Sequence, residues 1–166
     1  WGVIDMRLLA AIAPILLASP GLAAHPGPAD ENAVMVPVRA FYRAYDQGFT
    51  GPADFATADW NHINPGGGRT RGSEAVLNEV RAVHRSFLKD VTDTILSSDV
   101  RLASAGVAVV TVVSRTSPFA MPGESAATAH GQIRTFVVVR RGNRWLVMQD
   151  HNTNIASTQR GASPSP

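Results

Sequence analysis

Apolar side chains recur at helical spacing in two stretches of the chain. The first stretch predicts a helix between Asp30 and Gln47, because its apolar residues stand at positions i, i+3, i+4 and i+7. Pro37 either lies in the first turn of this helix or kinks it. The second stretch predicts a helix of about four turns with Ser73 as its N-cap. The two apolar stripes consist of Val38, Phe41, Tyr42 and Tyr45, and of Val76, Leu77, Val80, Val83, His84, Phe87 and Leu88.

The C-terminal half of the chain has the pattern of successive strands. Its apolar runs predict strands at residues 91–103, 107–115, 128–141 and 144–153. A further strand is predicted at residues 59–64, and a short helical turn at residues 52–57. Helices placed before a run of strands favour an α+β fold, here a curved mixed or antiparallel sheet wrapped around three N-terminal helices. Such a sheet leaves an internal pocket between its inner face and the helices.

The last predicted strand is apolar at its start and polar at its end. Because side chains alternate across a strand, its odd-numbered residues are expected to share one face. These residues are Trp145, Val147, Gln149, His151 and Thr153. A strand of this kind is buried at one end and opens into water at the other. We therefore expect its C-terminal end to form the rim of the pocket.

Composition narrows the classes of function. The chain has 166 residues, of which 45% are hydrophobic and 17% charged, which suits one compact domain, placed here at residues 34–156. The net charge of +2 comes without a dense run of Lys or Arg, which argues against nucleic-acid binding. The absence of cysteine excludes disulfides, thiolate catalysis and thiolate metal sites.

The N-terminal segment, residues 1–24, has the three parts of a leader with a secretory signal. Met6-Arg7 supplies a charged start, residues 8–18 are apolar, and small residues precede Ala24. The apolar run is short for a membrane span, so we expect a secreted or periplasmic protein with no stable membrane insertion after signal removal; an uncleaved anchor helix is the alternative. Residues 25–33 are expected to form a linker, and residues 157–166, rich in Ser and Pro, a disordered tail.

Three motifs stand out in the chain. They are Ala58-Asp59-Trp60-Asn61-His62-Ile63, Arg71-Gly72-Ser73-Glu74-Ala75 with His84, and Arg144-Trp145-Leu146-Val147 followed by His151-Asn152-Thr153. Together they resemble the NTF2-like superfamily. Within the superfamily the chain is most similar to the SnoaL-like/DUF4440 group, and there to the SgcJ/EcaC family. The resemblance covers residues 34–155. It implies a cone-shaped fold, in which a curved sheet and its helices enclose a ligand pocket.

The resemblance leaves the activity open. Its superfamily contains isomerases, epoxide hydrolases, cyclases, dehydratase-like enzymes and non-catalytic ligand carriers, and one fold supports many chemistries. The resemblance also implies that the protein forms homodimers, which pair through the outer face of the sheet. Asn61 and His62 depart from the family, in which an aliphatic residue usually follows the aromatic residue of this strand. Because this departure falls near the expected pocket mouth, the identity of the ligand is not carried over.

Two histidines are the candidate catalytic groups, because imidazole exchanges protons near neutral pH. His151 lies in the polar cluster that ends the last strand; the alternative is a structural histidine that caps the strand. His62 shares a strand face with Trp60 and Asn64, and the bulk of Trp60 marks that face as the inner one. The same parity places Asp59 outside. The alternative for His62 is a surface position beside the glycine run that follows.

The candidate ligand-binding residues are Tyr42, Tyr45, Trp60, Asn64, His84 and Gln149. Tyrosine offers apolar bulk with a polar tip, whereas a lone histidine on an apolar stripe, such as His84, is more often a core residue. The histidines are scattered without His-x-His spacing, so no metal site is expected, and no motif points to a cofactor.

Two hypotheses follow for the function. In the first, the domain binds a small, largely hydrophobic molecule, with or without cofactor-free proton transfer or hydrolytic addition. In the second, it is a non-catalytic dimerisation or partner-binding domain. A closed, wet, polar-tipped cavity favours the first hypothesis, and a cavity filled by Trp60, Tyr42 and Phe87 favours the second.

Overall fold

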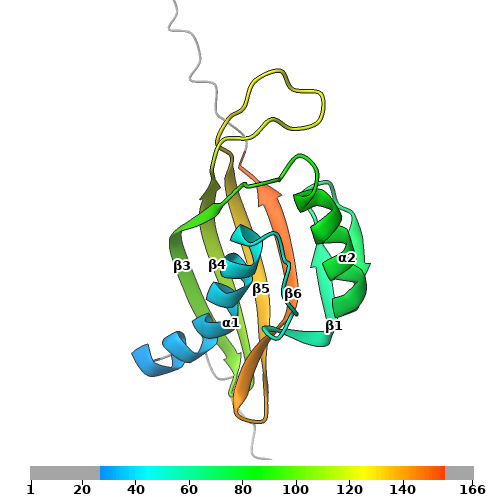
Figure 1. Cartoon of the computed structure of the whole chain (residues 1–166). Helices are drawn as coiled ribbons and strands as arrows, with labels where there is room; N and C mark the ends of the chain where they lie inside the picture. The colour runs from blue at the N-terminus through cyan, green and yellow to red at the C-terminus, as the bar shows by residue number, and fades with distance from the viewer. Residues whose placement is uncertain (1–26, 156–166) are drawn as a thin grey trace, which may run out of the picture.

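Six strands form one curved sheet with two helices against its inner face in the computed structural model, which describes residues 27–155 (Figure 1). The strand order is β2-β1-β6-β5-β4-β3. The elements are α1 (Pro28–Asp46), β1 (Ala56–Ile63), β2 (Arg69–Arg71), α2 (Ser73–His84), β3 (Asp93–Ser104), β4 (Val107–Thr116), β5 (Gly131–Arg141) and β6 (Arg144–Asn154). The predicted leader, signal and C-terminal tail lie outside the described residues.

The sheet is mixed. Strands β3 to β6 form the predicted antiparallel meander, and β2 pairs antiparallel with β1. Strand β1 lies parallel to β6, so a strand from the first half of the chain is inserted beside the last one. This pairing places His62 directly opposite Asp150. The α+β cone predicted from the sequence is therefore confirmed, with a parallel pair at the position where the two halves of the chain meet.

The helices differ in number and extent from the prediction. Helix α1 begins at Pro28, inside the stretch expected to be a linker, and continues through Pro37 to Asp46, where Gly48 at φ +62° follows. Helix α2 ends at His84 after 12 residues, and residues 85–90 form turns. The predicted helix at residues 52–57 is wrong: a turn there leads into β1 at Ala56. The protein therefore has two helices in the described region, and neither is long and apolar enough to cross a membrane.

Phe41 of α1 occupies the centre of the core. Its ring makes edge-on contacts with five aromatic neighbours at centroid distances of 5.2 to 6.1 Å. Those neighbours are Tyr42, Phe49, Phe55, Trp60 and Phe136. Edge-to-face pairs of this kind add to the free energy of area burial. The helical stripe of α1 thus anchors the helix across the sheet, as its spacing predicted.

A β-bulge at Met148 changes which face the end of β6 presents. Val137 pairs with Gln149 and Val138 with Val147, so Met148 is an extra residue without a partner. An extra residue reverses the alternation of the residues after it. Asp150 and Asn152 consequently point inward and are buried, whereas His151 is exposed. The prediction that His151 forms the rim of the pocket is wrong for this reason.

Candidate functional site

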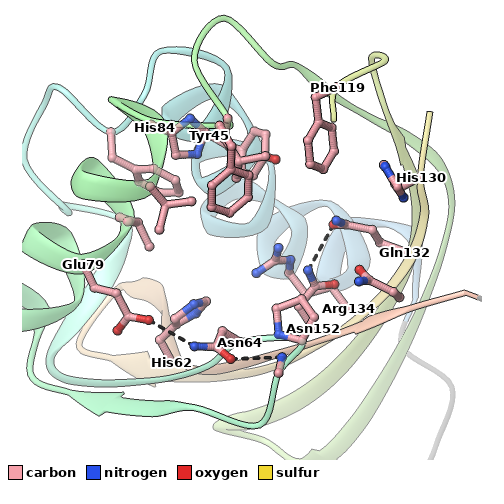
Figure 2. Close-up of a pocket in the computed structure, with 18 of the residues that line it drawn as sticks. Tyr45, His62, Asn64, Glu79, His84, Phe119, His130, Gln132, Arg134 and Asn152 are labelled. Atoms are coloured by element: carbon pink, nitrogen blue, oxygen red, sulfur yellow. Dashed lines mark hydrogen bonds between the residues drawn. The ribbon is translucent and has the colours of Figure 1, made fainter. Parts of the chain in front are cut away.

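A cavity of about 260 Å³ lies between the two helices and the inner face of the sheet (Figure 2). Most of its wall is apolar, and a polar group of side chains from β1, β5 and β6 forms one side. The apolar wall contains Phe41, Tyr45, Phe49, Val80, Val83, Phe87, Leu88, Phe119 and Met121. Neither Trp60 nor Tyr42 fills the space, because both lie buried outside its lining. Of the three side chains that could have filled it, only Phe87 reaches the lining, and the cavity keeps a polar side, which favours the first hypothesis.

Asp150 joins the polar side chains of three neighbouring strands. Its carboxylate is 0% exposed and accepts hydrogen bonds from Trp60 Nε1 at 2.8 Å and Arg134 Nη1 at 2.6 Å. The Nδ1 atom of His62 lies 3.0 Å from Oδ2 and 3.1 Å from Oδ1. A buried charge requires partners of this kind, because leaving it without them would cost several kcal/mol. Asp150 therefore fixes the positions of the two cavity-lining residues His62 and Arg134.

The charges in this group stabilise one another. Burial alone would raise the pKa of the Asp150 carboxyl, but the hydrogen bond and charge of His62, followed by Arg134 and Trp60, lower it below its ordinary value. Burial likewise opposes the charge of Arg134, and the neighbouring Asp150 carboxylate raises the pKa of the guanidinium. The Arg134 guanidinium also stacks over the Phe41 ring at 4.7 Å. Both groups are consequently ionised at neutral pH.

His62 presents one ring nitrogen to Asp150 and the other to the cavity. An ionised carboxylate only accepts hydrogen bonds, so Nδ1 carries the proton that it donates to Asp150. In the neutral imidazole, Nε2 then holds a free lone pair, and it makes no hydrogen bond to any residue within 27–155. A carboxylate behind one nitrogen sets the tautomer and orientation of the ring. This is the arrangement of an oriented general base facing a cavity.

Three buried polar atoms of the cavity lining have no hydrogen-bond partner within the described residues. They are Tyr45 Oη, Arg134 Nε and Asn152 Oδ1. Burial raises the pKa of Tyr45, so its hydroxyl keeps its proton and can donate. The side chain of Asn152 donates to Gln132 Oε1 at 3.1 Å and retains its own free oxygen. Buried polar atoms are rarely left unpaired, and all three belong to side chains that line the cavity.

Asn64 lines the cavity, as predicted, but both ends of its amide are already engaged. Its Oδ1 accepts hydrogen bonds from the backbone N–H groups of Gly66 and Gly68, at 3.0 and 2.9 Å. Its Nδ2 donates to Glu79 Oε1 at 3.2 Å, and Glu79 also accepts a hydrogen bond from Thr70. Asn64 therefore holds the glycine turn after β1 in place, and Glu79 on α2 is tied to the same turn (Figure 2).

The structure divides the other predicted site residues into three groups. Tyr45 and His84 line the cavity, where the His84 ring packs edge-on against Tyr45 at 4.5 Å and burial lowers the pKa of that imidazole. Tyr42 and Trp60 are buried behind the lining, with Tyr42 bonded to Ser114 at 3.4 Å. Gln149 and His151 lie outside the cavity, and Gln149 accepts a hydrogen bond from Asn61 at 2.7 Å.

Sequence reasoning missed Arg134 and Asp150, the two charged residues at the centre of the site. A signal for Arg134 was present, because it shares its parity in β5 with the buried residues Gln132, Phe136 and Val138. A charged residue on the buried face of a strand needs a buried partner. For Asp150 the bulge at Met148 concealed the same signal. No group of acidic or histidine side chains within residues 27–155 has the arrangement of a metal site.

Comparison with known proteins identifies the fold. No protein-family model matches the chain, and no curated protein matches it. Among solved structures, an uncharacterised protein with a cystatin-like fold from Caulobacter vibrioides is similar with a TM-score of 0.69 at 19% identity, covering 76% of this chain and 90% of that one. A ketosteroid isomerase-like protein from Erwinia carotovora has a TM-score of 0.65 at 16% identity, with 78% and 99% covered.

An NTF2-like protein of unknown function from Pseudomonas putida has a TM-score of 0.63 at 15% identity, with 84% of this chain and 98% of that one covered. At such low identity these likenesses report on architecture alone, because one fold supports many activities. Two of these structures are described as having a cystatin-like fold and as an NTF2-like protein, in agreement with the curved mixed sheet and two helices found here in residues 27–155. The chain therefore has the NTF2-like, cystatin-like α+β fold.

Proposed function

We propose that the cavity binds a small, largely apolar molecule and that His62 acts on it as a general base without a cofactor. The observation that carries the proposal is the geometry of His62, whose Nδ1 is held 3.0 Å from the buried Asp150 carboxylate while its ring lines the cavity. General bases need this combination of a fixed tautomer and access to substrate. Asp150 acts as the positioning residue.

The size and walls of the cavity indicate the class of ligand. An apolar cavity of about 150 Å³ is enough for one benzene ring, so the volume of about 260 Å³ here suits a molecule with one or two rings. The aromatic and aliphatic wall favours an apolar ring system, and the polar side favours a ligand that also carries oxygen-bearing groups. The signal-like N-terminus of the sequence supports an exported protein.

The proposed reaction moves a proton at a carbon next to a carbonyl group. The Nε2 atom of His62 takes the proton, and the electron pair of the broken C–H bond moves toward the carbonyl oxygen. The hydroxyl of Tyr45, a residue of the cavity lining, has no hydrogen-bond partner within residues 27–155 and can donate to that oxygen as its negative charge develops. The proton then returns from the imidazolium to carbon, so no oxidant or reductant is required.

Deuterium exchange into 2-tetralone tests this proposal. This ketone has two fused rings and acidic C–H groups beside its carbonyl, and its exchange in D₂O can be followed by proton NMR. We expect the protein to accelerate exchange over buffer, and His62→Gln to reduce the acceleration at least about tenfold, since a general base typically contributes a factor of about 10²–10⁴. The matched control is His151→Gln, which removes an exposed imidazole outside the cavity.

The control variant is expected to retain the rate of the unaltered protein. Equal rates for His62→Gln and the unaltered protein would contradict the assignment of the base. A rate no faster than buffer would contradict catalysis on this class of substrate. Native mass spectrometry tests binding independently of catalysis. We expect the purified protein and His151→Gln to carry a bound small molecule, and His62→Gln to lack it.

We also propose that the protein forms a homodimer through the outer face of its sheet. On that face Val109, Val113 and Val137 are only half-buried, and Ile133 is 40% exposed. An apolar patch on a sheet is a common protein–protein contact surface. Sedimentation equilibrium is expected to give twice the mass of one chain, and replacing Val113 by Lys is expected to shift the population toward monomer. A monomeric mass for the unaltered protein would contradict this assembly.

A further inference from the structure

We infer that the ligand carries a carboxylate, which binds to the free edge of Arg134. This inference rests on the proposed function, because it concerns the same cavity and names the polar end of its ligand. Arg134 comes from β5 and is only 3% exposed, yet it lines the cavity. Figure 2 shows it among the side chains that surround the open space, on the wall that also contains Gln132 and Asn152.

The guanidinium uses only part of its hydrogen-bonding capacity within the protein. Its Nη1 donates to Asp150 at 2.6 Å, while Nε is buried without any acceptor in the described region. Nη2 donates no hydrogen bond of normal geometry to residues 27–155 either. The Tyr42 hydroxyl donates to Ser114, and its oxygen lies near enough to the guanidinium for a weak hydrogen bond as well as a charge interaction. A buried charged donor without an acceptor is destabilising, more so than a neutral one, so an acceptor from outside the chain is expected.

The shape of the unused edge selects the kind of acceptor. Nε and Nη2 form one side of the planar guanidinium, and two parallel N–H groups match the two oxygens of a carboxylate. The contact with Phe41 at 4.7 Å and the hydrogen bond to Asp150 hold the guanidinium plane in position. The Arg134 side chain therefore loses little conformational entropy when the ligand binds. A single carbonyl oxygen would satisfy one of the two donors and leave the other unpaired.

The negative charges around the cavity do not occupy this edge. Asp150 shares its two oxygens among Trp60, His62 and Arg134. Glu79, the carboxylate that lines the cavity from α2, is bonded to Asn64 and Thr70 beside His62. An anionic group of the ligand would therefore be stabilised most at the free edge of Arg134. The ring system of the ligand would extend from this edge along the apolar wall.

A matched pair of probes tests the inference: 2-naphthoate and its neutral isostere 2-naphthamide, with binding to the full chain measured by calorimetry at pH 7.5. We expect the carboxylate to bind at least about tenfold more tightly, since hydrogen bonds between ionised partners are roughly twice as strong as those between neutral ones. In Arg134→Lys, which keeps a positive charge beside Asp150 but has no planar fork, we expect the two probes to bind within about twofold of each other.

The outcomes separate this inference from the function on which it rests. Equal binding of the two probes to the unaltered protein would overturn the inference and leave the apolar cavity as a binding site. Binding of neither probe would overturn both. A carboxylate preference that survives unchanged in a folded Arg134→Lys would place the anion elsewhere in the cavity and overturn the assignment to Arg134. Circular dichroism of the variant establishes that it is folded, and the probe comparison in the unaltered protein does not depend on the variant.

Discussion

Replacing Asp150 by Asn is expected to lower the free energy of unfolding by about 3–5 kcal/mol, the typical cost of removing one partner from a buried ion pair. The substitution keeps the shape of the side chain but removes the charge that Arg134 faces at 2.6 Å. It also weakens the acceptor of the Trp60 and His62 hydrogen bonds. Urea unfolding at pH 7 measures the change.

The pH for this measurement follows from the direction of the pKa shift. The folded-state pKa of Asp150 is lowered, so its ionised form contributes stability that is complete above the pKa of an unfolded Asp, near about 4. That contribution is lost as the pH falls through the folded-state pKa, and pH 7 is well above this window. The control is Asp59→Asn, which changes an exposed carboxylate on the neighbouring strand β1 and is expected to leave stability unchanged. A loss below about 1 kcal/mol for Asp150→Asn would mean that Arg134 finds another partner.

The substitution Asp93→Asn is expected to change the free energy of unfolding in a pH-dependent way. Relative to the unaltered protein, the variant should be more stable at neutral pH than at acid pH. Asp93 begins β3, is 3% exposed, and both of its carboxylate oxygens lack a hydrogen bond of normal geometry within the described residues. Burial raises its pKa from 3.8 to about 6, against smaller lowering effects of Ser114 and Arg134 and with a further raising effect of Asp46. Asn has the same shape and never has to be buried as an anion.

The sign of the effect follows from proton binding. Between about pH 4 and pH 6 the folded state holds more protons on Asp93 than the unfolded state does, so this residue makes stability fall as the pH rises. The total is about 3 kcal/mol for a shift of this size, at 1.36 kcal/mol per pKa unit. The difference in unfolding free energy between Asp93→Asn and the unaltered protein should therefore grow by about that amount from pH 4 to pH 7.5 in favour of the variant.

Urea titrations at those two pH values measure this difference. The control is Asp99→Asn on the same strand, where the carboxylate is exposed and 3.6 Å from Arg101. The difference in unfolding free energy between Asp99→Asn and the unaltered protein should not change with pH over the same interval, because exposed ion pairs contribute little to stability. A pH-independent difference for Asp93→Asn would show that its carboxylate is solvated or paired in solution.

Much of the framework could be predicted from local pattern. Strand alternation and helical stripes depend only on residues close together in the sequence, so α1, α2 and the meander were predictable. The same argument put Trp60 and His62 on the inner face and Asp59 outside, and the structure agrees. The prediction failed at two local irregularities. Residues 52–57 form a turn and not a helix, and the alternation of side chains along β6 does not continue past the bulge at Met148.

By itself the sequence determined the class of fold, the inward position of His62 and the apolar wall, because these follow from spacing along single elements. The tertiary structure alone decided the chemistry of the site. It inserted β1 beside β6, bringing His62 to a residue 88 positions away. The bulge at Met148 turned Asp150 inward and His151 outward, and β5 supplied Arg134. Pairing between distant strands depends on the whole packed sheet, and no local pattern carries that information.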